Sequence, residues 1–132
     1  MRGDGKLIQK ETLKQFGDAH LSKEEILRLN SDFQQIRRCG KYIGGRLMTL
    51  GLYRSEDIGF KVGFITSKKV HKRAVKRNRA RRQLKESLRL IKSRLDKDLW
   101  VVIIAKNTIL KASTVEIQKE LIYLTKKIHV FN

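Results

Sequence analysis

The chain has 132 residues, with 31 Lys and Arg against 13 Asp and Glu, so its formal net charge is +18. Hydrophobic residues make up 40% of it, which is enough for the core of one domain, and the nine aromatic residues exclude an aromatic-poor disordered composition. A compact chain with this charge repels itself, which favours a polyanionic partner, nucleic acid before an acidic membrane.

The first half of the chain predicts a helix and two strands. Residues 1–20 are polar and predict a mobile extension, followed by a single domain over residues 21–132. A helix is expected over about 31–39, ending at Gly40, with a turn of helix before it over 22–29. Alternating apolar residues predict strands over Arg46–Tyr53 and Phe60–Thr66. Because only a short polar segment separates the strands, we expect them to pair antiparallel.

The second half predicts a long helix from about Arg73 to Leu95, then a strand and a last helix. The apolar run DLWVVIIAKN indicates a central strand buried on both faces. The last helix, over about 114–129, is expected to use Thr114 as N-cap. The order of elements predicts an α/β (α+β) two-layer sandwich, with helices packed on a small mixed sheet. The residues expected to face the core from the two helices are Ala80, Leu84, Leu88, Ile91, Leu95, Val115, Ile117, Leu121, Leu124 and Ile128.

Positive charge is concentrated in the long helix and in the loop before it. Residues 68–94 hold 13 of the 31 basic residues and one acid, Glu86, so two thirds of the net charge lies there. At about 100° per residue, one stripe beside the apolar stripe is polar and mostly basic. Arg77 projects towards the apolar side, Arg81 lies between the stripes, and Arg79 lies further round. The polar stripe consists of Asn78, Arg82, Lys85 and Arg89.

This clustering works against stability, because basic side chains at i and i+4 repel by a few tenths of a kcal/mol per pair. A polyanionic ligand explains the clustering better, and the planar guanidinium of arginine suits phosphate. Two alternatives stay open. One is a solvated basic face. The other is a membrane-surface helix, disfavoured because no Trp or Phe lies opposite the basic row.

Other chemistries find little support in the sequence. The acids are dispersed, the three histidines have no metal-ligand spacing, and no phosphate loop, nucleophile elbow or zinc motif occurs. We therefore expect the chain to bind rather than to catalyse. No helix-turn-helix or zipper accompanies the basic helix, which favours recognition of RNA by backbone and shape. The aromatic residues expected mainly in the core are Tyr53, Phe60, Phe64 and Trp100.

The cellular compartment follows from three absences in the sequence. Cys39 is the single cysteine, so no internal disulfide can form. No apolar run approaches the roughly 18 residues that span a bilayer, and the N-terminus has no signal-peptide core. We expect a cytoplasmic protein.

The segment VGFITSKKVHKRAVKRNRARRQLKESLR resembles the signature of the bacterial ribonuclease P protein subunit family. The hallmark of that family is Arg-Asn-Arg, here residues 77–79, preceded by a strand that ends in Ser-Lys-Lys, here residues 67–69. The upstream segment LNSDFQQI resembles the family's first helix. The resemblance covers about residues 21–128 and implies a fold like the second domain of a small-subunit ribosomal protein, with a left-handed β-α-β crossover.

The resemblance also implies a division of labour within a ribonucleoprotein endoribonuclease. A large catalytic RNA, with magnesium ions that the protein does not itself bind, removes the 5′ leader of precursor tRNA. The protein, expected as a monomer in a 1:1 complex, binds that RNA and contacts the leader in a cleft between the first helix and the sheet. A general RNA-binding or ribosome-associated module is the alternative, and an enzyme in its own right is a third.

Site residues are carried over from the family position by position. The leader cleft is expected to include Phe33, Arg37 and Ser67. The chain departs from the family at Arg37, where a second aromatic is frequent, near Gly51, where some members have an aromatic, and at His71, where glycine is frequent. The residues expected to face RNA are Lys68, Lys69, Arg73, Arg77, Asn78, Arg79, Arg81, Arg82, Lys85 and Arg89.

Overall fold

A computed structural model of the chain describes residues 25–27 and 30–128. The extension predicted over residues 1–20 lies outside the described residues, as does most of the helical turn predicted over 22–29. The elements in chain order are α2 Asn30–Cys39, β1 Lys41–Gly44, β2 Met48–Arg54, β3 Lys61–Ile65, α3 Ala74–Ile91, η2 Lys92–Arg94, β4 Leu99–Ala105, η3 Asn107–Lys111 and α4 Thr114–Lys127.

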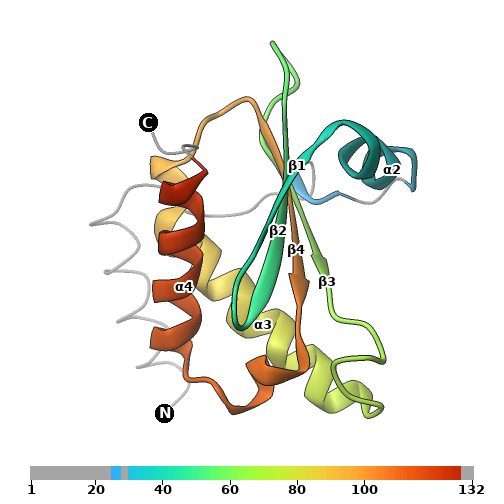
Figure 1. Ribbon diagram of the computed structural model, residues 1–132, viewed down its shortest axis with the longest axis vertical. Helices are drawn as coiled ribbons and strands as arrows, with labels where there is room; N and C mark the ends of the chain where they lie inside the picture. Colours follow the sequence, from blue (N-terminus) through green and yellow to red (C-terminus); the bar gives the residue numbers. More distant parts are fainter. Residues whose placement is uncertain (1–24, 28–29, 129–132) are drawn as a thin grey trace.

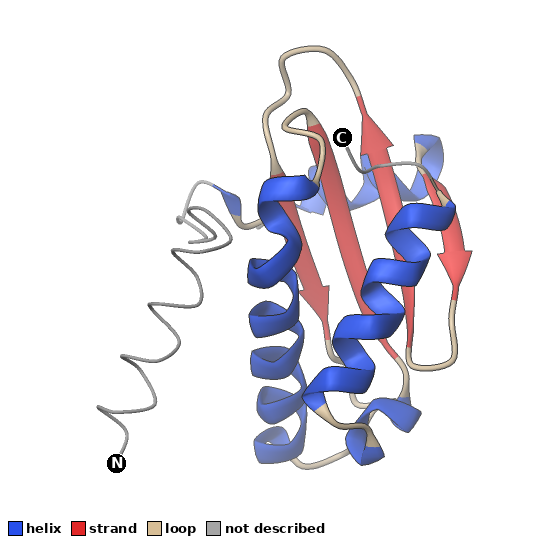
Figure 2. Ribbon diagram, turned by 90° about the vertical axis from the view of Figure 1, so that its left-hand side faces the viewer, coloured by secondary structure: helices blue, strands red, loops and turns tan. Residues whose placement is uncertain are grey.

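Four strands form one mixed sheet in the order β1-β2-β4-β3. Strand β3 runs parallel to β4, and the other neighbouring pairs are antiparallel. Helices α3 and α4 cover one face of the sheet, and α2 packs on the other face (Figure 1). Figure 2, seen from the side of α3 and α4, shows that the β3-α3-β4 crossover is left-handed, as the family resemblance implies and against the usual hand. The small mixed sheet with helices is thus confirmed.

Two expectations about the sheet are wrong. Strands β2 and β3 do not pair, because β4 lies between them and pairs with both. Strand β1 was not expected, since its sequence KYIG is only four residues long and most of it is exposed. The expectation for β4 is confirmed, because its apolar run occupies a central position and is buried over most of its length.

The main core lies between the sheet and helices α3 and α4. The predicted apolar stripe of α3 is confirmed, with Ala80, Leu84, Leu88 and Ile91 buried. In α4 two details are wrong. Val115 is 57% exposed instead of packed. The N-cap is Ser113, whose hydroxyl accepts from the backbone N–H of Glu116.

A smaller cluster on the opposite face packs α2 against the sheet through Leu27, Ile36 and Val102. Aromatic residues are half-buried at both faces. Phe60 and Phe64 pack against the main core, and Tyr53 and Trp100 pack against the α2 cluster. The expectation that these four aromatics serve mainly the core agrees with this packing. Each face of the sheet therefore has its own apolar cluster, and β3 lies at one edge of the sheet.

Candidate nucleic-acid interface

Helix α3 lies along β3, and two of its side chains and one that follows it mark the contact. The Arg81 Nη2 atom donates to Thr66 Oγ1 at 3.0 Å, at the end of β3. The Lys85 Nζ atom lies 6.0 Å from the centroid of the Phe64 ring. The Lys92 Nζ atom, after the helix, lies 5.8 Å from the Phe60 ring. The helix therefore runs antiparallel to β3, and its basic stripe lies at the rim of the sheet, where the sequence predicts it.

Most of the predicted RNA-facing side chains are exposed. Within residues 25–27 and 30–128, six of them make no side-chain hydrogen bond, ion pair or contact with an aromatic ring. Their charged or amide groups are solvated, so a phosphate could approach them without breaking a protein contact. These six are Lys68, Lys69, Arg73, Asn78, Arg79 and Arg82.

The remaining arginines of the predicted site are half-buried and have protein partners. The Arg77 Nη1 atom donates to the carbonyl oxygens of His71 at 2.9 Å and Lys72 at 2.8 Å. The Arg89 Nη1 atom contacts Glu86 at 3.4 Å. The Nε atoms of Arg81 and Arg89 are buried without a hydrogen-bond partner. These arginines therefore shape the helix and the loop before it, and only part of each guanidinium is available to a ligand.

The Arg-Asn-Arg motif spreads over three sides of α3. Arg77 points inward to the loop, and Asn78 lies on the stripe that borders β3. Arg79 lies on the opposite flank, where it lines a hollow of about 160 Å³ with His71, Lys76 and Gln83. The structure therefore does not gather the whole motif on one surface. A nucleic acid that contacts both Asn78 and Arg79 has to pass around the N-terminal half of the helix.

The loop between β3 and α3 presents its two lysines from a tight turn. The Val70 amide donates to the Ser67 carbonyl at 2.9 Å, and the Lys69 amide lies 3.3 Å from Ser67 Oγ. Ser67 is exposed, but its hydroxyl already organises this turn. Lys68 and Lys69 come shortly after the end of β3, so they lie near one end of this edge strand.

On the other face of the sheet, Phe33 of α2 covers β3. A Cβ atom on Gly63 would lie 2.7 Å from Phe33 Cε1, so only glycine leaves room for the ring. Arg37 is exposed in the last turn of α2. Phe33, Ser67 and the basic stripe thus all border β3. The expected leader cleft and the expected RNA-binding helix are continuous around this strand.

Lys61, which the sequence did not single out as a ligand, lies on this face beside Tyr53 and Trp100. The Lys61 Nζ atom lies 5.4 Å from the Trp100 ring, and the Tyr53 and Trp100 ring centroids are 5.8 Å apart. The Trp100 Nε1 atom is buried without a partner. Alternation along β3 places Lys61 on the same face as Gly63, and this period of two could have identified it.

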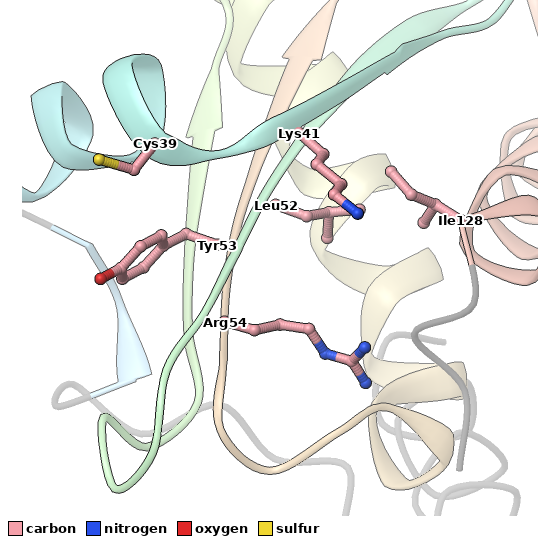
Figure 3. Close-up of a pocket in the computed structure, with 6 residues that line it drawn as sticks. All are labelled: Cys39, Lys41, Leu52, Tyr53, Arg54 and Ile128. Atoms are coloured by element: carbon pink, nitrogen blue, oxygen red, sulfur yellow. The ribbon is translucent and has the colours of Figure 1, made fainter.

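A separate hollow of about 270 Å³ lies at the end of the sheet where β1 begins (Figure 3). Lys41 and Arg54 extend to the side of Ile128, whereas Cys39 and Tyr53 point the other way. Arg54 is already paired with Asp96 at 2.7 Å. None of the residues that line this hollow belongs to the basic stripe of α3. We assign it no ligand.

Several acidic groups in the described part of the chain have structural partners. No group of three His, Cys, Asp or Glu side chains that could hold a metal occurs among the described residues. The Asp98 amide, followed by the Arg54 side chain, lowers the pKa of Asp96. The Ser113 amide and hydroxyl lower the pKa of Glu116. Both carboxyl groups are therefore held by protein groups that stabilise their charged form. None of the helices in the described ranges is long and apolar enough to cross a bilayer.

The fold and its basic helix define a small α+β protein with a strongly basic surface. The family model for ribonuclease P matches residues 21–129. The ribonuclease P protein component of Clostridium botulinum strain Loch Maree is 37% identical over 114 residues, covering 83% of this chain and 99% of the relative. That of Alkaliphilus oremlandii is 32% identical over 106 residues, covering 80% and 92%. The chain belongs to the ribonuclease P protein family.

Solved structures agree with this assignment. The RNase P protein of Staphylococcus aureus superposes with a TM-score of 0.73 at 28% identity, covering 82% of this chain and 98% of the other. That of Thermotoga maritima superposes with a TM-score of 0.69 at 22% identity, covering 78% and 96%, and supports the fold alone.

Proposed function

We propose that this chain binds the catalytic RNA of ribonuclease P and the 5′ leader of precursor tRNA, and thereby assists removal of the leader. The observation that carries the proposal is the group of exposed cations on α3, Arg79, Arg82 and Lys85, whose side chains make no hydrogen bond or ion pair within the described residues. Family membership gives the role in tRNA processing. The protein acts as one subunit of an endoribonuclease, in which the chemistry belongs to the RNA.

Helix α3 contacts the backbone of the catalytic RNA in this proposal. Arg82 and Lys85 face outward from the flank next to β3, and Arg79 faces outward from the opposite flank. Guanidinium groups match the geometry of phosphate oxygens, and each contact made releases condensed counterions. Arg77 holds the loop that carries the preceding lysines, so it contributes to binding partly through that loop.

The face that bears Phe33 receives the leader. A single strand can stack its bases on aromatic rings while lysines and arginines follow its backbone. Phe33 on Gly63 offers such a ring next to β3, and Arg37 and Ser67 are exposed nearby along α2 and after β3. A leader in this position would pass directly from the cleft to the basic helix.

Magnesium ions in this proposal are bound by the RNA rather than by the protein. The described residues bring together no set of three carboxylate, histidine or cysteine ligands. By lowering repulsion between the RNA and its substrate, the cations of α3 reduce the magnesium needed for productive binding. We further propose that the protein acts in the cytoplasm as one copy per catalytic RNA.

A reconstitution assay tests the proposed function. Purified protein is added to a bacterial ribonuclease P RNA and a precursor tRNA, and 5′ cleavage is followed over a magnesium titration. The protein should lower the magnesium concentration that gives half-maximal cleavage, and the protein alone should cleave nothing. A general RNA-binding module would bind the RNA without improving cleavage, and this result would contradict the proposal. Cleavage by the protein alone would instead indicate an enzyme in its own right.

A further inference from the structure

A single row of residues crosses the open face of the sheet from β1 to β3. Tyr42 of β1 pairs with Gly51 of β2, Gly51 pairs with Val102 of β4, and Val102 pairs with Gly63 of β3. Residues in register on neighbouring strands share a face of the sheet. Phe33 lies on this face above Gly63, so an aromatic residue stands at each end of the row.

Both rings occupy space that a glycine leaves open. A Cβ atom on Gly51 would lie 2.6 Å from Tyr42 Cε1 and 2.7 Å from Val102 Cγ1. A Cβ atom on Gly63 would lie 2.7 Å from Phe33 Cε1. The two glycines thus let one ring cover β2 and the other cover β3. Val102 between them is only 3% exposed.

The two rings differ in exposure. Phe33 is half-buried between α2 and the sheet. Tyr42 is 45% exposed, and its hydroxyl makes no hydrogen bond within the described residues. One side of the Tyr42 ring covers Gly51, and much of the remainder faces water. Packing alone accounts for the covered side. The exposed side is a fixed aromatic surface on a protein with net charge +18, and this combination suits the bases of a single-stranded nucleic acid.

We propose that Tyr42 stacks on a base of the single-stranded 5′ leader, as a second aromatic platform beside Phe33; this inference rests on the proposed function. Phe33 supplies a ring at the β3 edge of this face, and Tyr42 supplies one at the β1 edge. Gly51 and Gly63 are separated by two strand spacings, about 10 Å. Because β1 and β3 are the two edges of the sheet, Tyr42 takes a different base from the one at Phe33.

The test uses the reconstituted holoenzyme and precursor tRNAs that carry 2-aminopurine at single leader positions. Stacking quenches the fluorescence of 2-aminopurine. The leader position at which a Tyr42 variant loses this quench is therefore the position that Tyr42 contacts. The variants are Tyr42→Phe, which keeps a ring, and Tyr42→Leu and Tyr42→Ala, which do not. Tyr123→Ala is the matched control, because Tyr123 is 58% exposed on α4, over the opposite face of the sheet.

Tyr42→Leu and Tyr42→Ala should weaken binding of leader-bearing precursor about 5- to 30-fold, from the loss of one stacked base. Each should abolish the quench at one leader position, while Tyr42→Phe and Tyr123→Ala stay within about twofold of the wild type. Affinity for tRNA without a leader should not change. Tyr42→Leu still covers Gly51, so it separates loss of stacking from loss of folding.

Two results would overturn the assignment of Tyr42. One is wild-type affinity and quenching in Tyr42→Leu. The other is an equal loss of affinity for tRNA with and without a leader, which would indicate a structural role. Failure of the proposed function is distinguishable from both, because the wild-type protein would then not improve cleavage by the catalytic RNA at all.

Discussion

Helices α3 and α4 pack side by side on the same face of the sheet, yet they use their charged residues in opposite ways (Figure 2). Both acids of α4 are engaged in the fold. Glu116 forms a capping box with Ser113. Glu120 accepts three backbone N–H groups of the turn before β2, from Arg46 at 2.9 Å, Leu47 at 2.7 Å and Met48 at 3.1 Å.

Helix α3 has none of these devices. It begins without a side-chain cap and has no acid in its first turn. Its single acid, Glu86, contacts Arg89, and cations such as Arg79 and Arg82 have no protein partner within the described ranges. The difference indicates that α4 anchors the fold, whereas α3 combines an apolar stripe for the core with cations reserved for a ligand.

The largest effect should come from removing exposed cations of α3. Arg79→Ala, Arg82→Ala and Lys85→Ala together should weaken binding to ribonuclease P RNA about 100-fold near 0.1 M salt, because about three phosphate contacts are lost. The melting temperature should change little, since none of the three side chains makes a hydrogen bond or ion pair within the described residues. Filter binding and thermal unfolding measure the two effects.

A control with the same loss of charge is available on α4. Lys119, Lys126 and Lys127 are exposed, and their replacement by Ala removes three positive charges away from the proposed interface. RNA affinity should then fall by only a few-fold. Equal losses in the two triple variants would show that net charge, rather than the flank of α3, determines binding.

Glu120→Ala should produce the opposite pattern. Two of its three amide partners are partly buried, and they lose a charged acceptor, so the free energy of unfolding should fall by about 2–4 kcal/mol. Affinity for RNA should be unchanged at temperatures where the variant is folded. Glu120→Gln keeps an acceptor oxygen and should lose less. Urea unfolding gives the stability, and a Glu120→Ala protein as stable as the wild type would refute the anchoring role.

Arg77→Ala should fall between these cases, because this cation of α3 is used by the fold. Losing its two bonds to the His71 and Lys72 carbonyls should lower the free energy of unfolding by about 1–2 kcal/mol. RNA affinity should fall as well, since the loop with Lys68 and Lys69 becomes less ordered. Arg77→Lys keeps the charge but not the two-carbonyl geometry. If it restored stability fully, the geometric argument would fail.

Acidification should have the smallest effect. The pKa of Asp96 is lowered from 3.8, first by the Asp98 amide and then by Arg54, and that of Glu116 is lowered from 4.5 by Ser113. A carboxyl group with a lowered pKa stabilises the fold above its unfolded pKa, and this contribution is lost as pH falls through the folded pKa. The melting temperature should therefore be insensitive to these two groups near neutral pH and fall below about pH 4.5.

Glu116→Gln isolates one part of that pH response. This variant should be slightly less stable than the wild type at pH 7 and should lose less stability between pH 5 and pH 3. Parallel melting curves for the two proteins over this range would contradict the role of the Glu116 charge.

The sequence predicted the elements whose pattern is locally complete. The apolar stripe from Ala80 to Ile91 repeats at the helical period, and β4 is a continuous apolar run. Both elements can therefore be recognised from the sequence alone. The family signature supplied the crossover, because local patterns carry no information on its hand. Strand β1 is four residues long and mostly exposed, and it becomes a strand only through pairing with β2.

The wrong pairing of β2 with β3 has a physical cause. Proximity in sequence favours a hairpin, but a strand as apolar as β4 needs a neighbour on each side, and it inserts between the two. The same limit applies to single contacts. Glu120 resembles any solvated helix residue until the turn more than 70 residues away is known. The position of the Tyr42 ring depends on Gly51, and only the pairing register of β1 and β2 places these two residues opposite each other.

The most direct test of the account is the salt dependence of RNA binding. The dissociation constant for ribonuclease P RNA is measured from about 0.1 to 0.4 M salt for the wild type and for the two triple variants of α3 and α4. Each phosphate contact contributes roughly 0.7–0.9 to the slope of log affinity against log salt. The account predicts a slope that is shallower by about two to three units in the α3 variant and unchanged in the α4 variant. Equal flattening in both, or in neither, would contradict the claim that α3 is the RNA-binding surface.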